Sequence, residues 1–428
     1  MKKEKGITMI ALIVTIIVLL ILAGITIATI TSDNGIIRNA NDAKEQTEIG
    51  NEKEVVDRAV IQAMGNNSRG NIVEDELQEQ LDKITGDGET EVKMIRKKLV
   101  VEFLNSHRMY HVDDNGNVYE YIYKDLPIME YGSNFNERMN DYKASILTVT
   151  VLDNINIPEN SYKIFDVSKN QDESVKAWLV ENSENTNMYD LYIGGEDGVN
   201  IENCSSMFSS FSECTNIDLE NLYTENVEVF SSMFANCSKL ININLSNIDT
   251  SKATTMGQLF FNCSSIEKID LSNFDTANVT TMNLMFGNCN KLKYLDVSYL
   301  DTGNVTNMIF MFTGCGSLLT IDVSNWDTSK VTSMARMFCY CQFTSIDVSN
   351  WDTSNVIDMS YMFIGCAKLK ELDLSNWNTA NVNNMSYMFN DCKNLTNIYV
   401  SASTWIIGEN TNTYGMFISC GVSQVTIK

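Results

Sequence analysis

The sequence predicts a membrane-spanning helix, then a small α+β region, then a solenoid of stacked parallel β coils. Three observations support this order. An uncharged apolar run occupies residues 7–30, a segment with mixed helix-like and strand-like patterns follows it, and a unit of about 26 residues recurs over residues 201–428. The chain has 428 residues, 44% of them apolar, which is enough to bury a core.

Three lysines near the N-terminus precede the apolar run. Residues 7–30 carry no charge and, at about 1.5 Å per helical residue, can cross a hydrocarbon core of roughly 30 Å. Lys2, Lys3 and Lys5 would remain inside and the rest of the chain would lie outside. A simple transmembrane anchor through residues 7–30 is one interpretation, and it predicts a cell-membrane location with the solenoid extracellular.

A second interpretation uses the order of the elements, a basic leader of residues 1–6 ending in Gly6 and followed directly by the apolar helix. This order resembles the prepilin-type leaders of type IV pilin-like proteins. The resemblance implies cleavage between Gly6 and Ile7, methylation of the new N-terminus, and a prepilin peptidase and pilin-like subunits as partners. Family members usually start with Phe and carry Glu at the fifth position, where this chain has Ile7 and Ala11. These departures argue against a major pilin but leave processing open.

Residues 31–127 follow as a polar helix and a small α+β region. Asp33, Asn34 and Gly35 suggest a break between two helices. An acidic helix is predicted at residues 74–84, and strands are predicted at residues 98–104 and 117–123. The order resembles the helix and head of pilin-like proteins.

Residues 128–200 have mixed patterns and precede the repeats. Residues 146–157 and 188–195 predict strands, and residues 172–180 predict a short helix. Since a solenoid needs its first open edge covered, we expect this segment to form the N-terminal cap.

The repeats are marked by cysteines in one phase. Steps of 23 to 28 residues separate successive members. We therefore predict about eight coils over residues 201–428. The members are Cys214, Cys237, Cys263, Cys289, Cys315, Cys341, Cys366, Cys392 and Cys420.

Within one coil, Leu292, Leu295 and Val297 have the spacing of a leucine-rich repeat and end in an alternating strand. Such strands pair in parallel about 4.8 Å apart from coil to coil. The Met-x-x-Met-Phe stretch, as at residues 308–312, has the spacing of a tight helical turn on the opposite wall. One coil alone cannot bury its apolar face, so the coils must stack.

The full unit, NVTTMNLMFGNCNKLKYLDVSYLDT from Asn278 onward, resembles the BspA-like leucine-rich-repeat family of bacterial surface proteins. The resemblance covers about residues 200–428. It implies a solenoid displayed outside the cell for binding or adhesion, with an unknown protein or glycan as ligand. A minor pilin-like subunit of a type IV pilus or pseudopilus, with the solenoid as a binding tip on a pilus-like fibre, is the alternative.

Eleven cysteines on an exported chain permit a disulfide framework. Their shared phase between Phe and Leu instead favours a ladder of small, buried, reduced side chains. Cys204 and Cys339 lie outside this phase and are candidates for a bridge or a reactive thiol. The structural ladder is predicted at Cys237, Cys263, Cys289, Cys315, Cys341, Cys366 and Cys392.

Two further columns recur once per coil. Phe274, Trp326, Trp351 and Trp377 would form a candidate binding strip if they point outward, or fill a corner of the solenoid if they point inward. A column of aspartates would repel itself unless a cation binds, or unless the carboxylates are solvated or accept hydrogen bonds. Its members are Asp270, Asp296, Asp322, Asp347 and Asp373.

Composition and motifs exclude several classes of function. The net charge is −24 with no basic stripe beyond the N-terminus, so no nucleic-acid partner is expected. The two histidines, His107 and His111, have no cysteine or acidic residue at metal-ligand spacing. No nucleophile, phosphate-binding or zinc-protease motif occurs. We expect no enzyme, catalytic residue, metal or cofactor.

Overall fold

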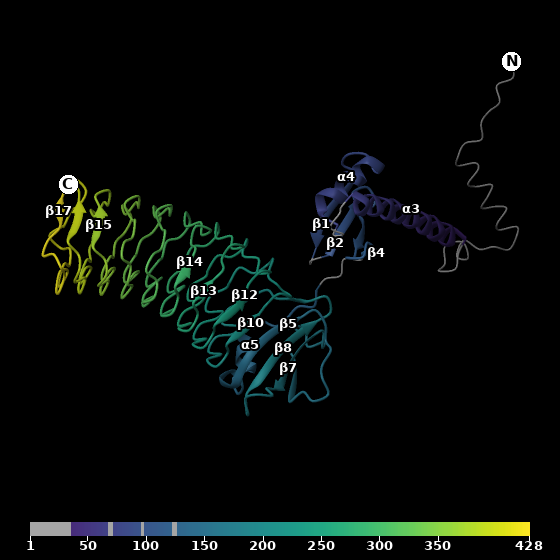
Figure 1. Cartoon of the computed structure of the whole chain (residues 1–428), viewed down its shortest axis with the longest axis horizontal. Coiled ribbons are helices and arrows are strands. Elements are labelled where there is room, and N and C mark those ends of the chain that lie inside the picture. Colours follow the sequence, from purple (N-terminus) through teal and green to yellow (C-terminus); the bar gives the residue numbers. More distant parts are fainter. Residues whose placement is uncertain (1–35, 67–71, 96–97, 122–125) are drawn as a thin grey trace, which may run out of the picture. The chain divides into compact units, whose positions relative to one another are not determined.

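The computed structural model describes residues 36–66, 72–95, 98–121 and 126–428, which form two compact units that divide between Asp125 and Leu126 (Figure 1). The predicted leader, the Gly6–Ile7 cleavage site and the apolar segment 7–30 lie outside the described residues. None of the helices within the described ranges combines the length and the apolar character needed to span a bilayer.

The first unit packs two helices against an antiparallel sheet of strand order β1-β2-β3-β4. Its elements are α3 (Ile36–Asn66), α4 (Glu74–Thr85), β1 (Thr90–Ile95), β2 (Lys98–Phe103), β3 (Arg108–Val112) and β4 (Val118–Tyr121). Helix α3 buries Val56, Ala59, Val60 and Ala63, which share one helical face. The predicted helix and strands of this region are therefore present.

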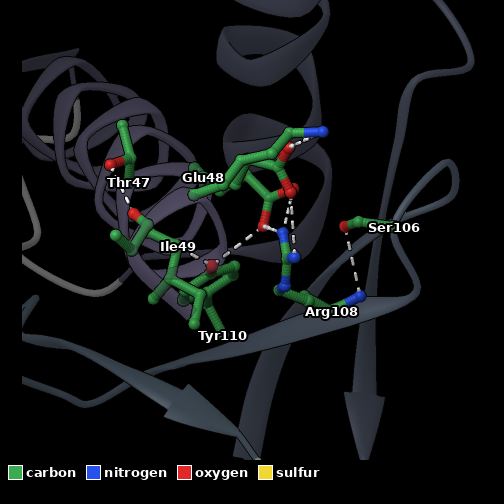
Figure 2. A network of polar contacts seen from close by, with 9 residues as sticks. Thr47, Glu48, Ile49, Ser106, Arg108 and Tyr110 are labelled. Carbon is green, nitrogen blue, oxygen red and sulfur yellow. Dashed lines mark hydrogen bonds and ion pairs between the residues drawn. The ribbon is translucent and has the colours of Figure 1, made fainter. Parts of the chain in front are cut away.

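A network of hydrogen bonds and ion pairs connects α3 to β3 at the edge of this core (Figure 2). The guanidinium of Arg108 lies 3.3 Å from the Glu52 carboxylate and 3.2 Å from that of Glu48. The Tyr110 hydroxyl donates a 2.9 Å hydrogen bond to Glu52, and burial raises the pKa of Tyr110. The network orients the helix that covers the sheet.

The second unit opens with a sheet that is continuous with the repeats. Strand β5 pairs in parallel with β10 (Asn216–Asp218), and β10 pairs in parallel with β12 (Asn242–Asn244), in the strand order β12-β10-β5-β8-β7-β6. Residues 126–200 contain α5 (Gly132–Arg138), η1 (Lys143–Ser145), β5 (Ile146–Leu152), β6 (Lys163–Asp166), β7 (Val175–Glu181), β8 (Tyr189–Gly195) and β9 (Val199–Asn200).

The short helix predicted at residues 172–180 is wrong. Val175–Glu181 forms β7, which pairs antiparallel with both β6 and β8. Its Val, Trp and Leu side chains favour a strand, and pairing on both edges outweighs the weak helical spacing. Trp178 is buried and stacks on Tyr192 at 5.8 Å.

Each later repeat forms one coil of a continuous stack (Figure 1). Parallel bridges join equivalent residues of neighbouring coils, such as Thr255 to Thr281 and Thr281 to Asn307. The short strands are β10 (Asn216–Asp218), β11 (Leu222–Tyr223), β12 (Asn242–Asn244), β13 (Lys268–Ile269), β14 (Tyr294–Leu295), β15 (Glu371–Leu374), β16 (Asn397–Val400) and β17 (Thr426–Ile427). The predicted repetitive region with short parallel strands is thus confirmed.

A column of stacked phenylalanine rings runs through the centre of the coils. Neighbouring ring centroids lie between 5.3 and 6.0 Å apart. The rings lie nearly parallel because every coil places the same residue at the same position. Members of the column are Phe208, Phe234, Phe260, Phe286, Phe312, Phe338, Phe363 and Phe389.

The Met-x-x-Met-Phe turn contains a left-handed residue directly before its second Met. At Leu284, φ is 56°, and at Arg336 it is 57°. The amide of Met285 donates to Met282 within the turn, whereas the amide of Leu284 donates to Ile309 in the next coil. The turn is therefore tight, as predicted, but it is not helical: a left-handed residue interrupts it, and part of its hydrogen bonding joins neighbouring coils.

Candidate binding surface

The cysteine ladder lies inside the coils. In seven of the nine members the thiol Sγ donates a hydrogen bond to the carbonyl oxygen of a phenylalanine in the preceding coil, as Cys289 does to Phe260 at 3.2 Å and Cys341 to Phe312 at 3.0 Å. The same bond is formed by Cys237, Cys263, Cys315, Cys366 and Cys392. The first member, Cys214, donates to Asn216 instead, and the last, Cys420, is only half-buried. All eleven cysteines are free thiols, so the ladder is a structural element.

The two cysteines outside the ladder differ in position. Cys204 is completely buried. Cys339 is 7% exposed and borders a surface groove described below. Neither forms a disulfide bridge.

The four aromatic residues of the predicted strip point inward. Phe274, Trp326, Trp351 and Trp377 are at most 6% exposed. The indole nitrogen of Trp351 donates a 3.0 Å hydrogen bond to Val323 in the preceding coil, and its ring packs 6.0 Å from that of Phe338. These residues fill a corner of each coil and do not form an exposed aromatic strip.

The aspartate column has its negative charge satisfied locally. In Asp296 and Asp322, Oδ1 accepts hydrogen bonds from the backbone amide and the hydroxyl of the serine two residues later. These serine contacts hold the pKa of both carboxyls below the usual value. Asp270, Asp347 and Asp373 accept the same amide bond. Across the described ranges, no group of three or more side chains is arranged to hold a metal ion.

A partly exposed strip that the sequence pattern did not predict lies at the left-handed turn position. It consists of Leu284, Phe310, Arg336, Tyr361 and Tyr387, one residue from each of five consecutive coils, and we call it the turn strip. All five side chains are half-buried, whereas the Met and Phe residues that follow them are buried. The left-handed backbone turns this one side chain outward while its neighbours enter the core.

The side chains of the turn strip pack on one another. The Arg336 guanidinium carbon lies 5.1 Å from the ring centroid of Phe310 and 4.4 Å from that of Tyr361. The Tyr361 and Tyr387 rings stack at 4.9 Å with an interplanar angle of 16°. Cation–π and ring stacking therefore hold these side chains in an ordered row.

A groove of about 480 Å³ opens along the turn strip. Arg336 is the only charged residue among those that line it. Tyr340, 57% exposed, covers Gly365, where an added Cβ would lie 2.3 Å from the tyrosine ring. The lining consists of Leu284, Phe310, Arg336 and Tyr361 with Phe261, Asn288, Thr313, Cys339, Tyr340 and Ile364.

The sequence contains a signal for this surface. The strip position changes from Ser232 and Gln258 to aromatic and cationic residues in later coils, while the Met and Phe after it hardly vary. A right-handed helical turn would give this position no particular direction toward solvent, so the variation alone does not predict a surface there.

Comparison with known proteins agrees with the repetitive character of the second unit. The family model described as "Mycoplasma protein of unknown function, DUF285" matches residues 202–321 and 306–427, which overlap and together span slightly more than half of the chain. No curated protein and no solved structure matches the sequence. Through these repeats, which include the whole turn strip, the chain belongs to the DUF285 family.

Proposed function

We propose that this protein is a bacterial cell-surface binding or adhesion protein. Its repeats would form a leucine-rich-repeat solenoid displayed outside the cell, and the turn strip would contact a protein or glycan ligand. The observation that carries this proposal is the ordered row of partly exposed side chains formed by Phe310, Arg336, Tyr361 and Tyr387 on four successive coils. Leucine-rich character is supported by the burial of Leu292, Leu295 and Val297 at the predicted spacing.

The strip has the properties of a binding surface. Tyr and Arg are over-represented among residues that dominate binding energy, and side chains already held in place lose little entropy on binding. The groove lining contains no carboxylate and no imidazole, and its one charged group is an arginine, which does not exchange protons at ordinary pH. These features favour binding without turnover, metal or cofactor.

The proposed display depends on the N-terminal segment. Residues 7–30 would anchor the chain in the membrane, with Lys2, Lys3 and Lys5 inside. A second candidate function, supported by Gly6 directly before the apolar run, is a minor pilin-like subunit carrying the repeats as a binding tip. Mass spectrometry of the native N-terminus tests this second candidate. A chain that starts at methylated Ile7 supports processing by a prepilin peptidase. An intact Met1 in cells that have this peptidase supports only the membrane-anchor interpretation.

The binding function is tested with a double variant, Tyr361→Ser and Tyr387→Ser. Serine occupies the same position at Ser232, so the coils should remain folded. The full-length parent is first tested against a panel of glycans and matrix proteins. For any ligand that the parent binds, the double variant should bind about tenfold or more weakly. Tyr294→Ser is the matched control, because Tyr294 is 70% exposed on β14 and outside the strip. Equal binding by parent and double variant would contradict the proposal.

A further inference from the structure

We infer that the groove at Arg336 binds an extended polypeptide segment, with the Arg336 guanidinium holding a carboxylate of that segment. The inference rests on the proposed binding function and specifies its ligand. Its basis is a charged group that is positioned by the protein but not neutralised within the described chain.

Arg336 is held by rings above and below it. Phe310 and Tyr361 lie on its two neighbouring coils, at 5.1 and 4.4 Å from the guanidinium carbon. Within the described residues its side chain forms no ion pair and donates no hydrogen bond. A guanidinium covered on its faces still presents N–H groups at its edge, and that edge matches the two oxygens of a carboxylate.

Several other basic side chains of the repeats have a polar partner one coil back, which Arg336 lacks within the described residues. Lys239 contacts Glu213 at 2.5 Å and Lys293 contacts Glu267 at 2.8 Å, each reaching one coil back. Lys330, in the same coil as Arg336, donates to Asn304. In a chain of net charge −24, the groove is a local positive site with no acidic residue in its lining, so it selects an anionic group.

The geometry favours a peptide over a sugar. A pyranose ring binds on an open aromatic face, but Tyr361 has Arg336 at 4.4 Å and Tyr387 stacked at 4.9 Å. The faces of the Tyr361 ring are thus covered, and the groove lining offers tyrosine hydroxyls and the aliphatic side chains of Leu284 and Ile364. Apolar peptide side chains fit such a surface, with the carboxylate between them.

The length of the groove suits an extended chain. Leu284 and Tyr361 are three coils apart, which is roughly 14 Å at a strand spacing of about 4.8 Å. About four residues of extended polypeptide span this length at about 3.4 Å per residue. The expected segment thus has one Asp or Glu flanked by apolar residues.

The test uses the full chain and a random peptide library displayed on phage. The parent should select peptides with an acidic residue between apolar ones. For a selected synthetic peptide, Arg336→Gln should weaken binding by about tenfold or more, and replacing the peptide's acidic residue by its amide should do the same. The two changes together should weaken binding little further, since both remove one contact. Lys330→Gln is the control for loss of one positive charge and should bind like the parent.

Different failures separate the two proposals. If the parent selects peptides that bind Arg336→Gln equally well, or if the two changes add, the carboxylate assignment is wrong while the binding function stands. If the parent binds only acidic glycans on an array, the polypeptide ligand is wrong. If the parent binds no peptide, no glycan and no matrix protein, the proposed function itself fails.

Discussion

The thiol of Cys289 donates a 3.2 Å hydrogen bond to the main-chain oxygen of Phe260, one coil earlier. The bond joins the two most regular columns of the repeat, the cysteines and the phenylalanines. It explains why a cysteine is suited to this position: the side chain is small enough for the interior and long enough to reach the carbonyl. A weak thiol donor also loses little when it leaves water.

Replacing Cys289 with Ser should therefore lower the free energy of unfolding by about 1–3 kcal/mol. The shorter C–O bond leaves the hydroxyl farther from the Phe260 oxygen, and a hydroxyl is more costly to remove from water than a thiol. Cys289→Ala should cost less than Cys289→Ser. Denaturant unfolding of the full chain measures both, and a serine variant more stable than the alanine variant would refute the argument.

Alkaline pH should destabilise the repeats. Burial raises the pKa of the Cys315 thiol to about 12. In the unfolded chain a cysteine has a pKa of about 8.5, so the unfolded state loses its proton first as pH rises. The stabilising contribution is therefore complete below about pH 8.5 and is lost progressively up to about pH 12.

This pH dependence is measured by unfolding at a series of alkaline pH values. Cys315→Ala should make the decline shallower, because one thiol no longer titrates. Native thiol labelling should be slow over the same range and become rapid on unfolding. Fast labelling of most ladder cysteines in the folded protein would show that they are not buried in solution.

Trp351→Ala should cost about 3–5 kcal/mol of stability. The side chain is 1% exposed, and its indole nitrogen donates to Val323 at 3.0 Å. Trp351→Phe keeps most of the buried ring and should cost less. Thermal unfolding distinguishes this from a surface role, since a variant that melts like the parent but no longer binds would place the ring at the ligand surface.

In the first unit, Tyr110→Phe should destabilise the contact between α3 and β3 by roughly 1–2 kcal/mol. The hydroxyl donates to the Glu52 carboxylate at 2.9 Å, and Glu52 then retains Arg108 as its partner. Amide hydrogen exchange of α3 should accelerate in this variant. Tyr119→Phe, at a tyrosine 53% exposed on β4, should leave the exchange rates unchanged.

Much of the repetitive region was predictable because its period makes equivalent residues meet. A step of 26 residues places Cys289 next to Cys315 and Phe286 next to Phe312 in adjacent coils, whatever the detailed path of the coil. The parallel strands and the stacked aromatic core follow from that repetition. The leader at residues 1–6 and the apolar segment at residues 7–30 remain predictions, because both lie outside the described residues.

The repeat period is enough to assign residues to columns, whereas the direction in which each column faces depends on how neighbouring coils pack. Trp351 and Arg336 each occupy a position that has an equivalent in the other coils. Trp351 is nevertheless buried, whereas Arg336 borders a groove. The direction of Arg336 depends on a left-handed φ of 57° in its turn, and that of Trp351 on a carbonyl of the preceding coil within reach of its indole. The repeat period specifies neither this φ angle nor this hydrogen bond, because both arise only when one coil packs against the next.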